Sequence, residues 1–165
     1  LVLALDILRK REPGLVFRLC IFGGGEPEFK NELEALIREK NLENYIEWKG
    51  FVKNIKEIYA GLQVVCVPTR TEEPFATSAL EAGLYAIPVI VTRKGGFPEI
   101  VKDGHSGYIV EANDPGAIAD KLAMLIKDPS LAAQAGLNHQ RIVTEVFSFQ
   151  NFINNWKSTL TALVS

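Results

Sequence analysis

The feature that most constrains the fold of this chain is a regular alternation between short apolar runs and segments with helical spacing. Within the second kind of segment, apolar residues recur at helical intervals, as at Phe29, Leu33 and Ile37. The strand-like runs lie at residues 15–22, 45–51, 64–69, 89–92 and 107–110. Apolar strands that alternate with helices predict a parallel sheet with both faces covered. We therefore expect an α/β fold with a Rossmann-like, doubly wound parallel sheet and C-terminal helices.

Length and charge limit the classes of function. The 165 residues suit one domain, residues 1–165. Lysine and arginine total 18 against 20 acidic residues, so the net charge of −2 offers no attraction for nucleic acid. No apolar run is long enough to cross a bilayer, and we expect a cytoplasmic protein. Peripheral membrane association would need segments absent from this sequence.

The start of the sequence, its two cysteines and its two histidines allow only general predictions. The chain opens on an apolar helical pattern without methionine or a capping residue, which favours an excised domain that has lost a neighbour. Cys20 and Cys66 lie in apolar runs and are expected to be buried, reduced thiols. His105 and His139 are expected at turns or on the surface. Because neither has a second ligand at metal-binding spacing, we expect no metal site.

The stretch "GGGEPE" (residues 23–28) follows a predicted strand and precedes a predicted helix, as in dinucleotide-binding folds. That motif requires a small residue where Glu28 stands. Glu26 and Glu28 would also place negative charge where a pyrophosphate must bind. We therefore expect no nicotinamide or flavin cofactor. Two interpretations remain open: Gly23 and Gly24 let another ligand approach, or the turn is purely structural.

Two glutamates flank a predicted helix start in "RTEEPFATSALEAG" (residues 70–83). Pro74 suits the first turn of a helix, so we expect the helix to begin there. Glu73 then lies in the loop, and Glu81 lies about two turns along the helix. Between them, the free backbone N–H groups of residues 75–77, which are Phe75, Ala76 and Thr77, form an expected anion site.

The order carboxylate, anion site, carboxylate matches the layout of a nucleotide sugar, which has hydroxyls at both ends and a diphosphate in the middle. Ionised carboxylates accept hydrogen bonds from such hydroxyls. The alternative is that Glu73 and Glu81 are ordinary surface acids on a helix that packs through its small residues.

The flanking sequence from Glu73 to Pro129, "EPFATSALEAGLYAIPVIV" onward, strongly resembles the C-terminal, nucleotide-sugar-binding domain of retaining glycosyltransferases of group 1, one half of a GT-B fold. The likeness covers nearly the whole chain. The signature of that family is two glutamates separated by seven residues. By this resemblance Glu73 bonds hydroxyls of the donor sugar near the reacting centre, and Glu81 bonds the ribose hydroxyls. The choice of base would depend on Val52 and the turn at Gly23–Gly25.

The resemblance implies transfer of a sugar from a nucleotide diphosphate sugar to an acceptor hydroxyl with retention. It implies no metal and no other cofactor, a cell-envelope or exopolysaccharide pathway, and an N-terminal acceptor-binding domain that this sequence lacks. The sequences "GGFPEIV" (residues 95–101) and "DGHSG" (residues 103–107) match family patterns and are expected to be largely structural turns.

The sequence departs from the family pattern at several positions. Ala76 and Ala86 stand where the family usually has glycine, and the basic pair that neutralises the donor diphosphate is absent. Arg70, Arg93 and Lys94 are the basic residues near the relevant loops. Ala76 favours an alternative, a degenerate and non-catalytic binding or scaffold module of the same fold. A nucleotide-sugar epimerase is a further alternative that needs residues from another domain.

Overall fold

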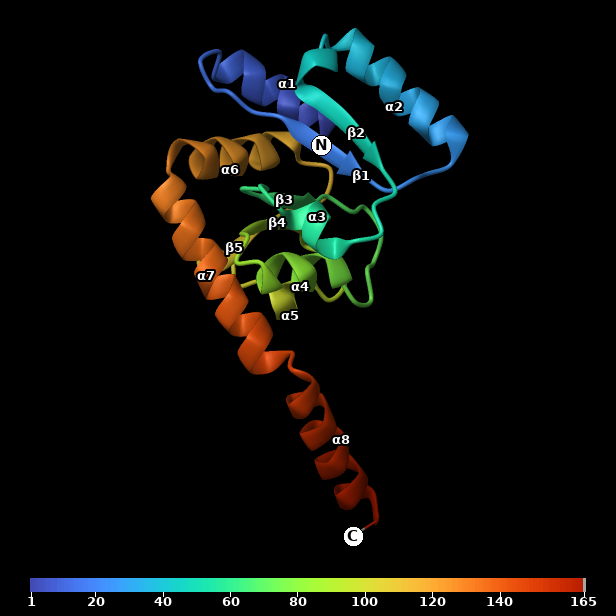
Figure 1. Ribbon diagram of the computed structural model, residues 1–165, viewed down its shortest axis with the longest axis vertical. Helices are drawn as coiled ribbons and strands as arrows, with labels where there is room; N and C mark the ends of the chain where they lie inside the picture. Colours follow the sequence, from blue (N-terminus) through green and yellow to red (C-terminus); the bar gives the residue numbers. More distant parts are fainter. Residues whose placement is uncertain (165) are drawn as a thin grey trace.

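The computed structural model describes residues 1–164, in which helices alternate with short strands as far as β5 and three helices follow (Figure 1). The elements in chain order are α1 (Val2–Arg11), β1 (Leu19–Phe22), α2 (Pro27–Glu39), the 3-10 helix η1 (Glu43–Tyr45), β2 (Ile46–Gly50), α3 (Ile55–Tyr59), β3 (Val65–Val67), α4 (Thr77–Leu84), β4 (Val89–Thr92), α5 (Phe97–Ile100), β5 (Gly107–Val110), α6 (Pro115–Lys127), α7 (Pro129–Val146) and α8 (Phe149–Val164). This order confirms the predicted α/β alternation. The first strand is shorter than residues 15–22, and α5 was not expected.

The strands pair in parallel, as predicted, but in two separate groups. β1 pairs with β2, and the second sheet has the order β3-β4-β5. β1 and β3 are therefore not joined by a ladder of hydrogen bonds, and the single continuous sheet that we expected is divided between them.

Helices cover both faces of the larger sheet, and β4 shows this best because all four of its residues are buried. Ile90 packs in one apolar cluster with residues of α1 and α6. Val89 and Val91 point to the opposite face and pack with residues of α4 and α5, among them Phe97. Alternate residues of a strand face opposite sides, so this sheet has a core on each face.

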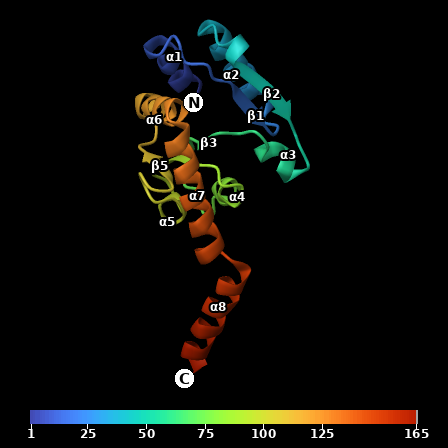
Figure 2. The same ribbon diagram turned by 60° about the vertical axis from the view of Figure 1, so that its left-hand side comes forward.

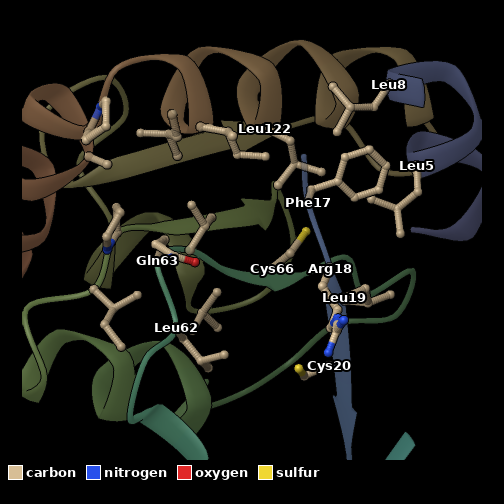
Figure 3. A pocket seen from close by; sticks show the side chains of 18 of the residues that line it. Leu5, Leu8, Phe17, Arg18, Leu19, Cys20, Leu62, Gln63, Cys66 and Leu122 are labelled. Atoms are coloured by element: carbon tan, nitrogen blue, oxygen red, sulfur yellow. The ribbon is translucent and has the colours of Figure 1, made fainter. Parts of the chain in front are cut away.

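An apolar cavity of about 610 Å³ lies between β1 and β3 (Figure 3). Leu5 and Leu8 of α1 and Leu122 of α6 line one wall, and Cys20 and Cys66 line the walls formed by the two strands. The two cysteines are free thiols, as predicted, but each is only half-buried. Removal from water raises the pKa of the Cys66 thiol to about 12.

The long helix α7 packs against α4 through a buried histidine. His139 is fully buried, and its Nε2 lies 2.8 Å from the carbonyl oxygen of Ala79. Because a carbonyl only accepts, Nε2 carries the proton; Nδ1 has no partner among the described residues. Burial lowers the pKa of His139. The expectation of a surface or turn position was wrong for His139, since the contact between α4 and α7 encloses the ring.

The turn at residues 103–107 is structural, as expected. The Ser106 hydroxyl accepts the Lys102 N–H at 2.9 Å, and Asp103 Oδ1 accepts the Ile109 N–H at 2.9 Å. These bonds close the loop that leads into β5.

The last helix, α8, extends away from the rest of the domain (Figures 1 and 2). It carries a stripe of exposed apolar side chains at helical spacing, which are Phe149, Phe152, Trp156, Leu160 and Leu163. Neither this helix nor any other in the described part of the chain combines the length and apolar character needed to traverse a bilayer.

Candidate functional site

The loop that follows β3 is anchored to β4 before it reaches the two glutamates. The buried hydroxyl of Thr92 donates to the carbonyl oxygen of Thr69 at 2.7 Å. The loop therefore starts from a fixed point at the carboxyl edge of the β3-β4-β5 sheet, where ligands of such sheets bind.

Glu73 is held through its backbone. The N–H of Gly96 donates to the Glu73 carbonyl at 2.9 Å. Gly95 has a φ of +49°, and a Cβ there would overlap the Glu73 backbone, so the approach of the two loops requires glycine. The half-buried Glu73 side chain has no hydrogen-bond or ion-pair partner among residues 1–164. Its carboxylate is thus fixed at its base and free to accept bonds from a ligand.

Glu72 closes the contact between these loops, and the sequence analysis did not identify it. Its carboxylate accepts the Gly95 N–H at 2.6 Å and a hydrogen bond from the Lys94 ammonium at 3.3 Å. The Gly95 bond first, and the Lys94 bond second, lower the pKa of Glu72. Its position beside Glu73 was the available signal, but only the fold shows that it faces the loop at residues 93–96.

The helix after Glu73 begins at Thr77, so the predicted start at Pro74 was wrong. Ala76 precedes the first helical residue with φ −78° and ψ 75°, and no side chain caps the helix. The cause is tertiary, because Gly95 and Gly96 pack against the backbone at residues 73–74 and hold it as a loop.

This later start changes the expected anion site. Phe75 and Ala76 lie before the helix rather than in its first turn. The Thr77 N–H donates to the Phe75 carbonyl at 2.9 Å, and the Ala79 N–H donates to the Ala76 carbonyl at 3.0 Å. Of the three predicted N–H groups, that of Thr77 is therefore engaged, whereas those of Phe75 and Ala76 have no acceptor among residues 1–164. The N-terminal end of α4 still lies between the two glutamates in the chain.

The Ala76 side chain packs inside the protein. It is 2% exposed and belongs to the apolar cluster that contains Phe97. Its methyl group therefore does not extend from the loop into solvent, where a ligand would approach, whereas Phe75 is exposed.

Glu81 lies on α4 and is half-buried. Its Oε2 accepts a hydrogen bond from the Tyr59 hydroxyl at 2.9 Å. Tyr59 is a second residue that the sequence analysis missed, because it lies on a different helix, 22 residues earlier. The site thus contains one open carboxylate, Glu73, and one oriented carboxylate, Glu81.

The glycine turn and Val52 lie at the end of the β1-β2 pair. Gly23 has a φ of +103°, and its N–H donates to the Gly50 carbonyl at 2.7 Å. A Cβ at Gly23 or Gly24 would meet no atom within 4 Å, so this backbone is accessible. In the described part of the chain, no hydrogen bond or ion pair connects Gly23, Gly24 or Val52 to the loop of Glu73.

The basic residues near the site differ in their availability. Arg93 pairs with Glu111 at 2.8 Å, and Lys94 pairs with Glu72. Arg70 is exposed and forms no ion pair within residues 1–164.

The large apolar cavity is a separate feature, because it is lined by none of the predicted site residues.

Comparison with known proteins identifies the family. The family model described as glycosyl transferases group 1 matches residues 1–141. The chain is 31% identical over 176 residues to D-inositol 3-phosphate glycosyltransferase of Corynebacterium urealyticum, covering 99% of this chain and 38% of that protein. It is 29% identical over 141 residues to N-acetyl-alpha-D-glucosaminyl L-malate synthase of Bacillus anthracis, covering 86% of this chain and 36% of that protein. The chain therefore spans little more than a third of these relatives.

Solved structures agree with this assignment. The C-terminal domain of a glycosyl transferase group 1 family protein from Francisella tularensis is 33% identical with a TM-score of 0.78, over 90% of this chain and 78% of that chain. Anabaena HepE in complex with UDP-glucose is 25% identical with a TM-score of 0.84, over 98% of this chain and 44% of that chain. The predicted fold, one half of a GT-B glycosyltransferase, is thereby confirmed. The chain belongs to the family of glycosyl transferases group 1.

Proposed function

We propose that this chain is the donor-binding domain of a glycosyltransferase that moves a sugar from a nucleoside diphosphate sugar to an acceptor hydroxyl with retention of configuration. The observation that carries the proposal is the pair of carboxylates in one loop and helix, with Glu73 free and Glu81 oriented. Membership of the family and the UDP-glucose complex of Anabaena HepE support it.

In this proposal each carboxylate holds one end of the donor. Glu73 accepts hydroxyls of the sugar close to the carbon that reacts, and Glu81 accepts the ribose hydroxyls. The departing diphosphate lies near the start of α4, where the helix dipole favours negative charge. Arg70, in the adjoining loop, forms no ion pair within residues 1–164 and is therefore free to approach the diphosphate. The acceptor would be bound by another domain, and closure between domains would exclude water.

We also propose that donor binding needs no metal ion. Among residues 1–164, no three His, Cys, Asp or Glu residues lie close enough together to hold one. In this proposal the calorimetric affinity for the nucleotide is equal in Mg²⁺ and in EDTA, which also tests for an ion held jointly by a carboxylate and the nucleotide phosphates. An affinity that requires Mg²⁺ would contradict this part of the proposal.

Isothermal titration with UDP, GDP and ADP tests the donor site. We expect one nucleotide to bind preferentially and Glu81→Ala to weaken it by about 1 to 3 kcal/mol, the range for loss of hydrogen bonds to a charged group. Glu145→Ala is the matched control, because Glu145 is an exposed acid on α7 and is not one of the site residues, so the change should leave the affinity unchanged. If no nucleotide binds to the folded chain, or if both variants lose affinity equally, the assignment of the site fails.

The scaffold alternative rested on Ala76, and no structural observation favours it. The buried methyl group leaves the surface of the loop unobstructed. Nucleotide binding in the titration would distinguish the two functions, because a scaffold has no need of a donor.

A further inference from the structure

Tyr59 is held in one orientation by contacts at both ends of its side chain. The residue is 6% exposed. Its ring stacks on the ring of Tyr85, with centroids 5.2 Å apart and an interplanar angle of 11°. Its hydroxyl lies 2.9 Å from Glu81 Oε2 and 3.3 Å from the Ser78 carbonyl oxygen. The hydroxyl therefore has a fixed position beside the Glu81 carboxylate.

The single proton of this hydroxyl goes to Glu81. The bond to the carboxylate is the shorter of the two, and bonds to an ionised acceptor are the stronger class. Burial, with a further contribution from Glu81, raises the pKa of Tyr59, so that the hydroxyl stays protonated and remains a donor. One oxygen of Glu81 is thus engaged, and Oε1 has no bond in the described structure.

We propose that Tyr59 is a positioning residue for the nucleotide site: by holding Oε2 of Glu81, it directs Oε1 toward the ribose hydroxyls of the donor. This inference rests on the proposed function. Without the Tyr59 bond, the glutamate side chain would be free to change rotamer, and its alignment would be lost at the moment of binding.

The contact also joins two elements at the site. Tyr59 is the last residue of α3, whose start is fixed by the Asn54 side chain accepting the Lys56 N–H at 3.1 Å. Glu81 belongs to α4. The orientation of Glu81 therefore depends on the placement of α3, which begins three residues after Val52.

Tyr59→Phe tests the proposal, because it keeps the ring and its stacking on Tyr85 and removes only the hydroxyl. Affinities for UDP, GDP and ADP and for their 2′,3′-dideoxy analogues are measured by calorimetry on the wild-type chain and on the variant. We expect the variant to bind the preferred ribonucleotide about tenfold more weakly, the scale of one charged hydrogen bond. Its affinity for the dideoxy analogue should not change, since that ligand has no hydroxyls for Glu81 to accept.

Two controls separate positioning from stability. Tyr108→Phe removes another buried tyrosine hydroxyl, on β5, and should leave both affinities unchanged. In a Glu81→Ala background, Tyr59→Phe should cause little further loss, because alanine offers no acceptor for the Tyr59 hydroxyl and the bond is already absent. Circular dichroism confirms that each variant is folded.

The outcomes distinguish this inference from the proposed function. If the wild-type chain prefers ribonucleotides over dideoxynucleotides and Tyr59→Phe leaves that ratio unchanged, the positioning role is wrong and the donor site stands. An equal loss for both kinds of nucleotide also overturns it, because the effect is then structural. If the wild-type chain binds none of the six nucleotides, the proposed function fails and the role of Tyr59 fails with it.

Discussion

Ala86 is the residue whose backbone conformation departs most clearly from what its side chain favours. It has a φ of +54°, in the left-handed region where a Cβ is strained. The turn cannot relax freely, because the carbonyl of Ala86 lies against Gly136 of α7, where no Cβ would fit. The family resemblance implied glycine at this position, and the positive φ of Ala86 is a physical reason for such a preference.

We expect Ala86→Gly to stabilise the protein by about 0.5 to 1 kcal/mol, because relief of left-handed strain exceeds the entropic cost of glycine. Ala133→Gly is the matched control. Ala133 is exposed on α7, where the same change should destabilise by about 1 kcal/mol. Urea unfolding monitored by circular dichroism measures both. Destabilisation by both substitutions would show that Ala86 is not strained.

At the scale of elements, the contact between α4 and α7 depends on a small residue facing a buried ring. A Cβ at Gly83 of α4 would lie 3.0 Å from the His139 ring, which is closer than side chains ordinarily approach. His139 is neutral there, because its proton is used by the Ala79 carbonyl and a second proton on Nδ1 would have no acceptor. The helix that carries Glu81 is therefore packed on a group that resists protonation.

We expect the unfolding free energy to fall as the pH is lowered from about 7 toward about 5. The pKa of His139 is lower in the folded state than in the unfolded chain. As the pH falls below the ordinary histidine pKa of about 6.5, His139 is therefore protonated first in the unfolded chain, which stabilises the unfolded state relative to the folded state. The stabilising contribution is complete above that value and is lost as the pH falls through the folded pKa. Urea unfolding at a series of pH values measures this dependence.

His139→Gln should make the unfolding free energy depend less steeply on pH between about 7 and about 5, whatever its effect on the unfolding free energy at neutral pH. His105→Gln is the control, because it removes the other histidine and leaves the enclosed ring of His139 in place, so the part of the slope that His139 supplies should remain. A slope that survives in His139→Gln, or disappears in His105→Gln, would contradict the assignment.

Across the whole molecule, the two groups of strands differ in how well they are enclosed. β4 is hydrogen-bonded on both sides and completely buried. β1 and β3 are half-buried and face the cavity of about 610 Å³ between the two sheets. A two-stranded sheet, in which each strand has an unpaired edge, has fewer stabilising contacts than the central strand of a covered sheet.

We expect backbone amides of β4 to exchange with deuterium at least about tenfold more slowly than those of β1, because opening β1 exposes fewer buried contacts. Hydrogen exchange followed by mass spectrometry compares peptides that contain Val89–Thr92 with peptides that contain Leu19–Phe22. β5, at the edge of the larger sheet, is the internal reference and should be intermediate. Equal protection of β1 and β4 would show that the two sheets unfold as one unit.

Much of the fold was predictable from the sequence, because helical and strand periodicity are local properties. The bounds of β4 and β5 were predicted without error. Glu73 and Glu81 were singled out from their places on either side of a predicted helix start, and the comparisons confirm the family that the flanking sequence resembles. Whether these residues bind a donor stays a prediction.

Other features were decided only by contacts between distant parts of the chain. The start of α4 at Thr77 depends on Gly95 and Gly96 packing against an earlier loop, so Pro74 alone gave the wrong position. The enclosure of His139 between α4 and α7, and the bond from Tyr59 to Glu81, likewise join residues far apart in the chain. Apart from α5, the sequence by itself determined the order and type of the main helices and strands, since those follow from the period of apolar residues. The tertiary structure decided where the loops end and how each carboxylate is held, since these depend on which surfaces meet after folding.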